Sequence, residues 1–135
     1  MTILERLQED YDRFPENQSF DLYAEDVYFK DPLNQFCGVA KYQEMIGFIQ
    51  KWFINTRMEV HGIEQQDNEI HTRWTLYWQA PFPWKPQMAI TGRSELILND
   101  AGLVCSHIDY WDCSRFSVFK QLFFPVASSN LEIGG

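Results

Sequence analysis

The sequence predicts an α+β fold in which helices cover one face of a curved antiparallel sheet. Two observations predict it: apolar residues recur at helical spacing before Thr56, and the period of the pattern changes to two after it. The predicted order is helix, helix, strand, helix and then a four-strand meander, which is typical of α+β proteins. A chain of 135 residues is long enough for one domain with a real core, so we expect a single domain over 1–135.

Two helices are predicted at the start of the chain. Thr2 and Glu5 have the spacing of a capping box, and apolar side chains recur at helical spacing over 3–14. Pro15 suits the first turn of a second, short helix. That helix is expected to point three side chains inward, namely Phe20, Leu22 and Tyr23.

A strand and a third helix follow. Residues 26–31 alternate like a strand that stops at Pro32. An apolar stripe then predicts a longer helix, so that three N-terminal helices pack on the sheet. The stripe consists of Tyr42, Met45, Ile46, Ile49, Trp52 and Phe53.

The meander is predicted from four runs with a period of two. Asn99 to Gly102 is a four-residue hairpin loop that closes the last pair of strands. The segment from Ser114 predicts a short helix, before a loose end at 130–135. The four runs span 57–65, 70–80, 88–98 and 103–112.

The meander divides its side chains between two faces. Pairing Leu98 with Leu103 and Ala80 with Met88 sorts them into an apolar inner face and a polar outer face, as expected of a sheet covered on one side. The inner face collects Trp74, Leu76, Trp78, Ile90, Gly92, Leu96 and Trp111. The outer face collects Arg73, Thr75, Tyr77, Gln79, Thr91, Arg93, Glu95, Ser106 and Asp112.

Three polar residues, Ser94, His107 and Asp109, break the apolar pattern of the inner face. A carboxylate without partners among tryptophans would cost several kcal/mol. This register places Gly92 opposite Asp109 and Ser94 opposite His107, so that Gly92 leaves space beside the acid. The group indicates a pocket, and an internal hydrogen-bonding cluster that only supports the core is the alternative reading.

Composition excludes several classes of partner. Nineteen acidic and 11 basic residues give a formal charge of −8, which disfavours nucleic acid and anionic membranes as partners. Cys37, Cys105 and Cys113 are odd in number and lack CxxC spacing, so we expect reduced thiols in the cytoplasm. His61 and His71 lie on different strands, and we expect no metal and no cofactor.

The stretch from Tyr23 to Ile49, followed by the meander that ends in HIDYWD, resembles the nuclear transport factor 2-like superfamily, which includes the SnoaL and ketosteroid isomerase-like proteins. The resemblance implies a cone in which three helices and a curved sheet enclose a cavity. The sequence looks closest to an uncharacterised family of cyanobacteria and plant plastids. That likeness rests on Trp74-Thr75, Pro83-Trp84-Lys85, Gly92 and Asp100-Ala101-Gly102.

Two enzyme families of this superfamily offer comparisons at single residues. Asp31, in KDP, looks like the general base of ketosteroid isomerases, and Tyr11 like the tyrosine that stabilises their enolate oxygen. Ser94 stands where those enzymes place a protonated acid. Asp109, in DYWD, resembles a catalytic acid of limonene-epoxide hydrolases.

Two functional hypotheses follow. The first is an aromatic-lined pocket for a small apolar or ring-containing molecule, with isomerase, cyclase or hydratase chemistry at Asp31, Asp109 and His107. Its ligand-binding residues would be Tyr11, Trp74, Trp78, Gly92, Ser94 and Trp111. The second is a non-catalytic interaction module that forms a homodimer through the outer sheet face. A cavity of about 300 Å3 or more would favour the first.

Overall fold

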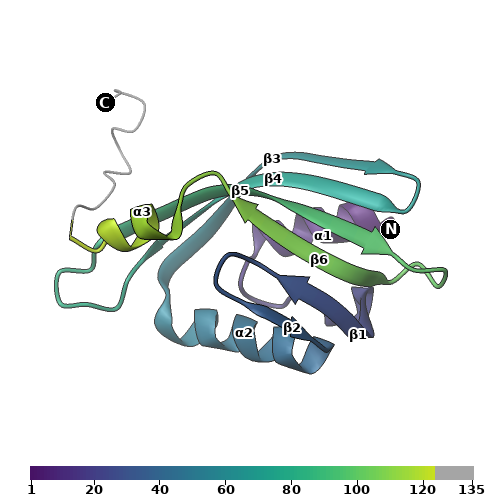
Figure 1. Cartoon of the computed structure of the whole chain (residues 1–135), viewed down its shortest axis with the longest axis horizontal. Coiled ribbons are helices and arrows are strands. Elements are labelled where there is room, and N and C mark those ends of the chain that lie inside the picture. Colours follow the sequence, from purple (N-terminus) through teal and green to yellow (C-terminus); the bar gives the residue numbers. More distant parts are fainter. Residues whose placement is uncertain (124–135) are drawn as a thin grey trace.

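The computed structural model describes residues 1–123, which form a mixed sheet covered by helices (Figure 1). In this view α1 (Ile3–Asp12) lies behind the sheet, and α2 (Val39–Trp52) runs below the edge formed by the first two strands. The short α3 (Arg115–Lys120) lies at the opposite end of the molecule from the N-terminus. The strands are β1 (Tyr23–Lys30), β2 (Gln35–Cys37), β3 (Ile54–Gln66), β4 (Glu69–Gln79), β5 (Gln87–Leu98) and β6 (Val104–Trp111).

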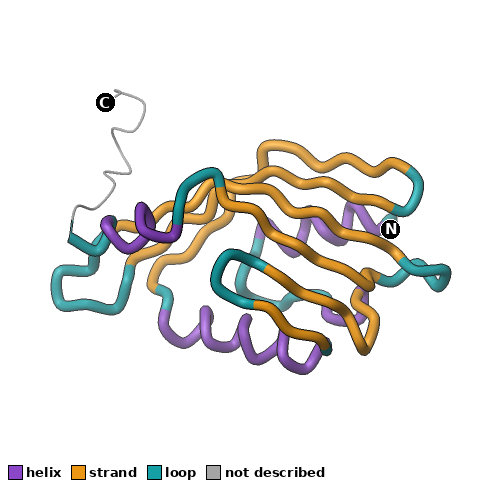
Figure 2. Tube along the Cα trace, viewed as in Figure 1, coloured by secondary structure: helices purple, strands orange, loops and turns teal. Residues whose placement is uncertain are grey.

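The strands of the described residues lie in the order β2-β1-β6-β5-β4-β3 (Figure 2). The predicted meander is confirmed, because β3, β4, β5 and β6 pair antiparallel with their neighbours in sequence. The prediction of a wholly antiparallel sheet is wrong, since β1 pairs with β6 in parallel. Alternation along a strand indicates which face is buried but not the direction of a partner that is distant in sequence.

The predicted second helix is wrong. Residues Phe20–Leu22 form only a single 3-10 turn, and Tyr23 already belongs to β1. The preceding segment folds around the buried carboxylate of Asp10. That carboxylate accepts hydrogen bonds from the backbone N–H of Ser19 at 3.0 Å and from its hydroxyl at 2.9 Å.

The α-helices of residues 1–123 therefore lie at 3–12, 39–52 and 115–120, and only two of them precede the meander. The predicted capping box at Thr2 is confirmed, as is the short helix after Ser114, whose hydroxyl accepts from the backbone N–H of Ser117 at 3.0 Å. The predicted loose end at 130–135 lies outside the described residues.

The register of the meander differs from the predicted one by two residues in both hairpins. Ser94 lies opposite Asp109 rather than His107, and Gly92 lies opposite Trp111 rather than Asp109. The last loop closes through a hydrogen bond between Asn99 and Leu103, and a bulge follows next to Leu98. The loop and the bulge each shift the pairing by one residue along β6, which accounts for the difference of two.

The hairpin of β4 and β5 shows the same two-residue difference between the predicted and the observed register. Trp78 lies opposite Met88, and Leu76 opposite Ile90. A shift by two residues keeps every side chain on its face, because successive side chains of a strand alternate. The predicted division into an inner and an outer face is therefore retained, and the inner tryptophans Trp74 and Trp78 are buried.

The core consists of separate apolar clusters rather than one continuous layer. One cluster lies between α1 and the sheet and contains Leu7, Leu22, Val27, Ile70, Leu96 and Val104. A second contains Trp74, Trp78, Ala80, Met88, Ile90 and Val118. The third consists of Phe29 on β1 and of Tyr42 and Ile46 on α2. A cavity lies between these clusters, on the inner side of the sheet.

Gly92 supplies a testable feature of this packing. A Cβ atom at this position would collide with the backbone carbonyl oxygen of Tyr110 and approach the Trp74 ring to 3.1 Å. We expect Gly92→Ala to lower the free energy of unfolding by about 2 kcal/mol, because the β5–β6 pairing has to shift. Urea unfolding followed by circular dichroism measures this.

Gly47, on α2, provides the control, because nothing lies within 4 Å of the point that a Cβ atom would occupy there. Gly47→Ala should raise the free energy of unfolding by about 0.5–1 kcal/mol, since alanine is the better helix former. Equal stability of the two variants would contradict the close approach at Gly92.

Candidate functional site

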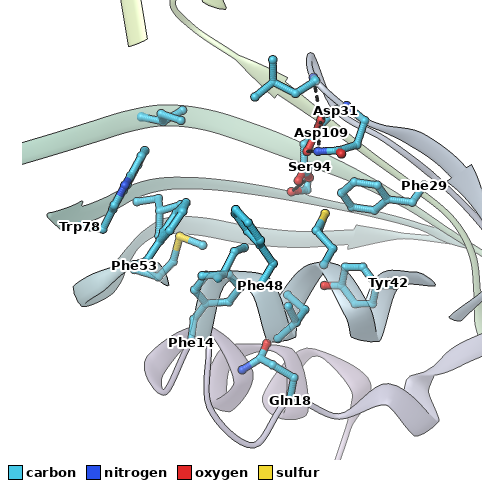
Figure 3. A pocket seen from close by; sticks show the side chains of 18 of the residues that line it. Phe14, Gln18, Phe29, Asp31, Tyr42, Phe48, Phe53, Trp78, Ser94 and Asp109 are labelled. Carbon is cyan, nitrogen blue, oxygen red and sulfur yellow. Dashed lines mark hydrogen bonds between the residues drawn. The ribbon is translucent and has the colours of Figure 1, made fainter. Parts of the chain in front are cut away.

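A cavity of about 870 Å3 lies between the inner face of the sheet and the helices (Figure 3). Its walls come from the three α-helices and from all six strands of the described residues. The volume exceeds the about 300 Å3 that a small-molecule pocket requires. By that criterion, the structure favours the pocket over a filled cone.

The cavity has an aromatic end and a polar end (Figure 3). At the aromatic end, the rings of Phe53 and Trp78 stack with centroids 4.6 Å apart. At the polar end, Ser94, Asp31 and Asp109 gather next to the Phe29 ring. A molecule in the cavity would therefore meet apolar surface over most of its length and carboxylates at one end.

Asp109 is the centre of a hydrogen-bonded group. Its Oδ1 accepts from the Ser94 hydroxyl at 2.5 Å and lies 2.8 Å from Nε2 of His107. The Ser94 oxygen in turn accepts from the indole N–H of Trp74 at 2.9 Å. The register that places Ser94 opposite Asp109 makes these contacts possible.

The second carboxylate oxygen of Asp109 faces the cavity. Among the described residues, every fully buried side-chain nitrogen or oxygen has a hydrogen-bond partner, whereas Oδ2 of this carboxylate has none. Oδ2 therefore retains accessible surface, and Asp109 lines the cavity. One oxygen is held in place, and the other is available to a ligand.

His107 connects Asp109 to two buried tyrosines. Its Nδ1 lies 3.1 Å from the hydroxyl of Tyr23, which is 3.5 Å from that of Tyr42. The Tyr23 hydroxyl donates to Tyr42. A carboxylate accepts hydrogen bonds, so Nε2 of His107 is the donor to Asp109, and the ring is held from its other side by the contact with Tyr23.

Tyr11, on α1, reaches the cavity next to the polar group. Its hydroxyl lies 2.7 Å from the hydroxyl of Thr72. Burial raises the pKa of Tyr11 to about 12, with a smaller contribution from the Asp109 charge, and burial likewise raises the pKa of Tyr23 and of Tyr42. These hydroxyls stay protonated at neutral pH, so they can donate hydrogen bonds.

Asp31 lines the same cavity from the turn after β1. Its Oδ1 accepts from the backbone N–H of Leu33 at 2.8 Å and of Asn34 at 2.6 Å. The side-chain amide of Asn34 lies 3.1 Å from Oδ1 and 3.2 Å from Oδ2. Burial raises the pKa of Asp31 although these hydrogen bonds oppose the shift. The carboxylate therefore closes the turn as well as facing the cavity.

The cavity brings together all but one of the residues that the sequence singles out. Gly92 does not line it, because the Tyr110 carbonyl and the Trp74 ring take up the space next to it. The residues brought together are Tyr11, Asp31, Trp74, Trp78, Ser94, His107, Asp109 and Trp111.

The sequence does not reveal the hydrogen-bond partners of His107 and Tyr11. It places Tyr23 in a helix, treats Tyr42 only as part of an apolar stripe, and does not identify Thr72 as the partner of Tyr11. Tyr23 and Tyr42 offer one usable signal, because both are predicted to point inward. A buried tyrosine hydroxyl requires a hydrogen-bond partner, so a polar group is expected nearby.

Two further properties bear on the site. Within residues 1–123, no group of three histidine, cysteine, aspartate or glutamate side chains is arranged to hold a metal ion. None of the helices described is long and apolar enough to cross a membrane.

Comparison with solved structures identifies the class of fold as nuclear transport factor 2-like. A protein from Catenulispora acidiphila with a ketosteroid isomerase-like fold, in complex with trimethylamine, shares 15% identity, with 88% of this chain and 90% of that chain covered and a TM-score of 0.71. A Jannaschia protein described as a SnoaL-like polyketide cyclase shares 14%, with 91% and 92% covered and a TM-score of 0.72. An LEH-like epoxide hydrolase from M. tuberculosis shares 13%, with 98% and 93% covered and a TM-score of 0.69.

These TM-scores establish the shared fold, as the sequence resemblance predicted. The model of one family, described as "Uncharacterized conserved protein (DUF2358)", matches residues 1–107 of the chain. The chain therefore belongs to that family. No curated protein matches it.

The buried tyrosines predict a loss of stability at alkaline pH. Above about pH 10 the unfolded chain releases the Tyr11 proton, whereas the folded protein retains it up to about pH 12. The folded pKa is raised, so this contribution to stability is present below pH 10 and is lost as the pH rises towards 12. The loss from this group should reach about 1.4 kcal/mol per pH unit.

We expect Tyr11→Phe to flatten this dependence, because the variant has no proton to release at this position. The free energy of unfolding in urea, measured at intervals from pH 8 to pH 11, tests the expectation. Below about pH 9 the variant should follow the wild-type slope at a lower overall stability, since the hydrogen bond to Thr72 is absent. An unchanged slope above pH 10 would show that Tyr11 does not resist ionisation.

Proposed function

We propose that the cavity binds a small apolar or ring-containing molecule and transfers a proton to or from it, as isomerases, cyclases and hydratases do. One observation carries the proposal: a carboxylate is held through Oδ1 while its Oδ2 faces an aromatic cavity. A carboxylate fixed in this way needs no reorganisation to accept a proton from a bound molecule.

In the proposed reaction, Asp109 Oδ2 is the proton acceptor. Ser94 and His107 hold the carboxylate by hydrogen bonds to Oδ1, and the Tyr23 hydroxyl contacts the other ring nitrogen of His107. These bonds keep the free oxygen directed at the cavity. Most of the cavity wall is apolar, which lowers the local dielectric constant and strengthens the polar interactions next to it.

Tyr11 is the proposed donor to the negative charge that develops on the substrate. If the Thr72 hydroxyl donates to the Tyr11 oxygen, the Tyr11 proton is free to point at a substrate oxygen. Its raised pKa keeps that proton in place at neutral pH. Proton removal at Asp109 and charge stabilisation at Tyr11 would act on neighbouring atoms of one substrate.

Asp31 is the alternative proton acceptor, as the resemblance to ketosteroid isomerases implies. Burial raises the pKa of Asp31, which makes it a stronger base than an exposed aspartate, but both of its oxygens take part in closing the turn. Asp109 is favoured because its Oδ2 accepts no hydrogen bond from the described residues. Substitution of Asp109 and substitution of Asp31 are therefore expected to affect proton exchange differently.

The structural relatives support this choice of chemistry. They include proteins described as a polyketide cyclase and as an epoxide hydrolase. The ketosteroid isomerase-like relative was solved with trimethylamine. We transfer from them the binding of a small molecule, and we place it in the cavity described above.

Proton transfer can be tested before a substrate is known. The purified protein is incubated in D2O with a panel of cyclic ketones and enones, and NMR follows the exchange of the protons next to the carbonyl group. We expect catalysed exchange in at least one of them, and Asp109→Asn should slow it by about a hundredfold or more.

Two comparisons complete this test. Asp31→Asn should retain most of the exchange if Asp109 is the base, and loss of exchange only in Asp31→Asn would assign the base to Asp31 instead. Asp112→Asn is the matched control, because Asp112 is an exposed aspartate just beyond β6. Absence of catalysed exchange across the panel would contradict the proposed chemistry.

A second candidate function, a homodimeric interaction module, is favoured by the outer face of the sheet. The guanidinium of Arg57 lies 4.0 Å from the ring centre of Tyr77, and that of Arg93 lies 4.1 Å from that of Tyr110. Arginine and tyrosine are enriched at protein interfaces. We propose that this face forms a homodimer.

Native mass spectrometry of the purified protein tests the dimer and shows at the same time whether a ligand is retained. We expect a dimeric mass that Arg93→Glu converts to the monomer, because the substitution places a second negative charge next to Glu95 on the proposed contact face. Lys51→Glu, on α2 and away from the sheet, is the control for charge reversal. A monomeric wild type would contradict the dimer.

Two finer assignments also remain proposals. We propose a reducing, cytoplasmic location, which is supported by the free thiols of Cys37, Cys105 and Cys113. We also propose that the nearest relatives are proteins of cyanobacteria and plant plastids, because of the tryptophan, proline and glycine motifs that carry that likeness.

A further inference from the structure

We infer that the cavity selects a ligand with a positively charged nitrogen on an apolar, ring-containing body, and that Asp109 is the counter-ion of that nitrogen. The inference rests on the proposed binding function of the same cavity and specifies the charge of its ligand. It does not depend on whether proton transfer occurs.

The cavity has an excess of negative charge. Of its four acidic lining residues, Asp10 is compensated by the Arg13 guanidinium at 2.9 Å. Glu44 and Lys41 are both exposed on α2. Among the described residues that line the cavity, Lys41 is the one lysine or arginine. Asp31 and Asp109 then share the polar end of the cavity without a lysine or arginine to oppose them.

The groups that bind Asp109 occupy only one of its oxygens. The Ser94 hydroxyl and Nε2 of His107 both contact Oδ1. A mostly buried carboxylate with no lysine or arginine beside it gains more from a cation than from a neutral ligand. Its Oδ2 is the atom still open to such a cation.

The negative potential extends around the cavity wall. After burial, the Asp109 charge is one of the causes that raise the pKa of Tyr11, Tyr42 and Asp31. These groups lie on α1, on α2 and in the turn after β1, so the carboxylate acts on three sides of the cavity. The same potential opposes a ligand that carries a carboxylate of its own.

The aromatic surface suits an organic cation in particular. The indole rings of Trp74, Trp78 and Trp111 all line the cavity. The face of an aromatic ring attracts an ammonium group, and tryptophan does so most strongly. A hydrated metal ion would gain little from such walls, whereas an organic cation can place its ammonium group at the carboxylate and its apolar body against the rings.

Isothermal titration calorimetry with three probes of one shape tests the inference. The probes are naphthylmethylamine, naphthylmethanol and naphthoate, which differ in charge at the polar end. At about pH 8 and low ionic strength we expect the ammonium probe to bind about tenfold more tightly than the alcohol, and the carboxylate to bind most weakly. Raising the salt concentration should narrow the difference.

Asp109→Asn removes the charge but keeps an oxygen that can accept from Ser94 and His107. In this variant the ammonium and alcohol probes should bind equally, whereas Asp112→Asn should keep the wild-type preference. The comparison of the three probes on the wild-type protein needs no variant, so the test does not depend on how Asp109→Asn folds.

The outcomes separate this inference from the proposed function. Binding of the alcohol with no preference for the ammonium probe would overturn the inference and leave the proposed pocket in place. Tightest binding of the carboxylate would do the same. Failure of all three probes to bind would count against both.

Discussion

The hydrogen bonds to Oδ1 of Asp109 are the constraint on which the rest of the site depends. A carboxylate among tryptophan side chains is costly unless polar partners stabilise it. Ser94 and His107 provide them, and each is in turn held by an aromatic side chain, Trp74 or Tyr23. The polar group is thus embedded in the aromatic wall, and the cavity can remain open beside it.

This arrangement also explains why the register of the sheet matters. The Ser94 hydroxyl reaches Asp109 because the two residues lie directly opposite each other across β5 and β6. The bulge next to Leu98 and the close approach at Gly92 establish that pairing. Small features of the strands therefore decide which oxygen of the carboxylate remains free.

The fold places no restriction on the chemistry by itself. The chain shares its architecture with proteins described as a cyclase and as an epoxide hydrolase, at identities of 13–14%. Function has to be argued from the side chains in the cavity. Here these are two acids that face aromatic rings, which directs attention to the charge of the ligand as well as to its shape.

Much of this protein could be predicted from local patterns in its sequence. The alternation along the strands predicts which side chains point inward, and it assigns Trp74, Trp78, His107 and Asp109 to the face that lines the cavity. Pattern alone also indicates the first helix, the long α2 and the helix after Ser114. These features depend on residues that are close in sequence, and periodicity reports such relations directly.

The tertiary structure decided what depends on distant residues. The parallel pairing of β1 with β6, the loop around Asp10 that replaces the second helix, and the two-residue shift of the register all involve partners that no local pattern specifies. The same is true of Tyr23 against His107. The sequence by itself determined which strand residues of the meander point to the inner face. Only the tertiary contacts decided which of their atoms are bonded and which remain free, because hydrogen-bond partners are selected by position in space.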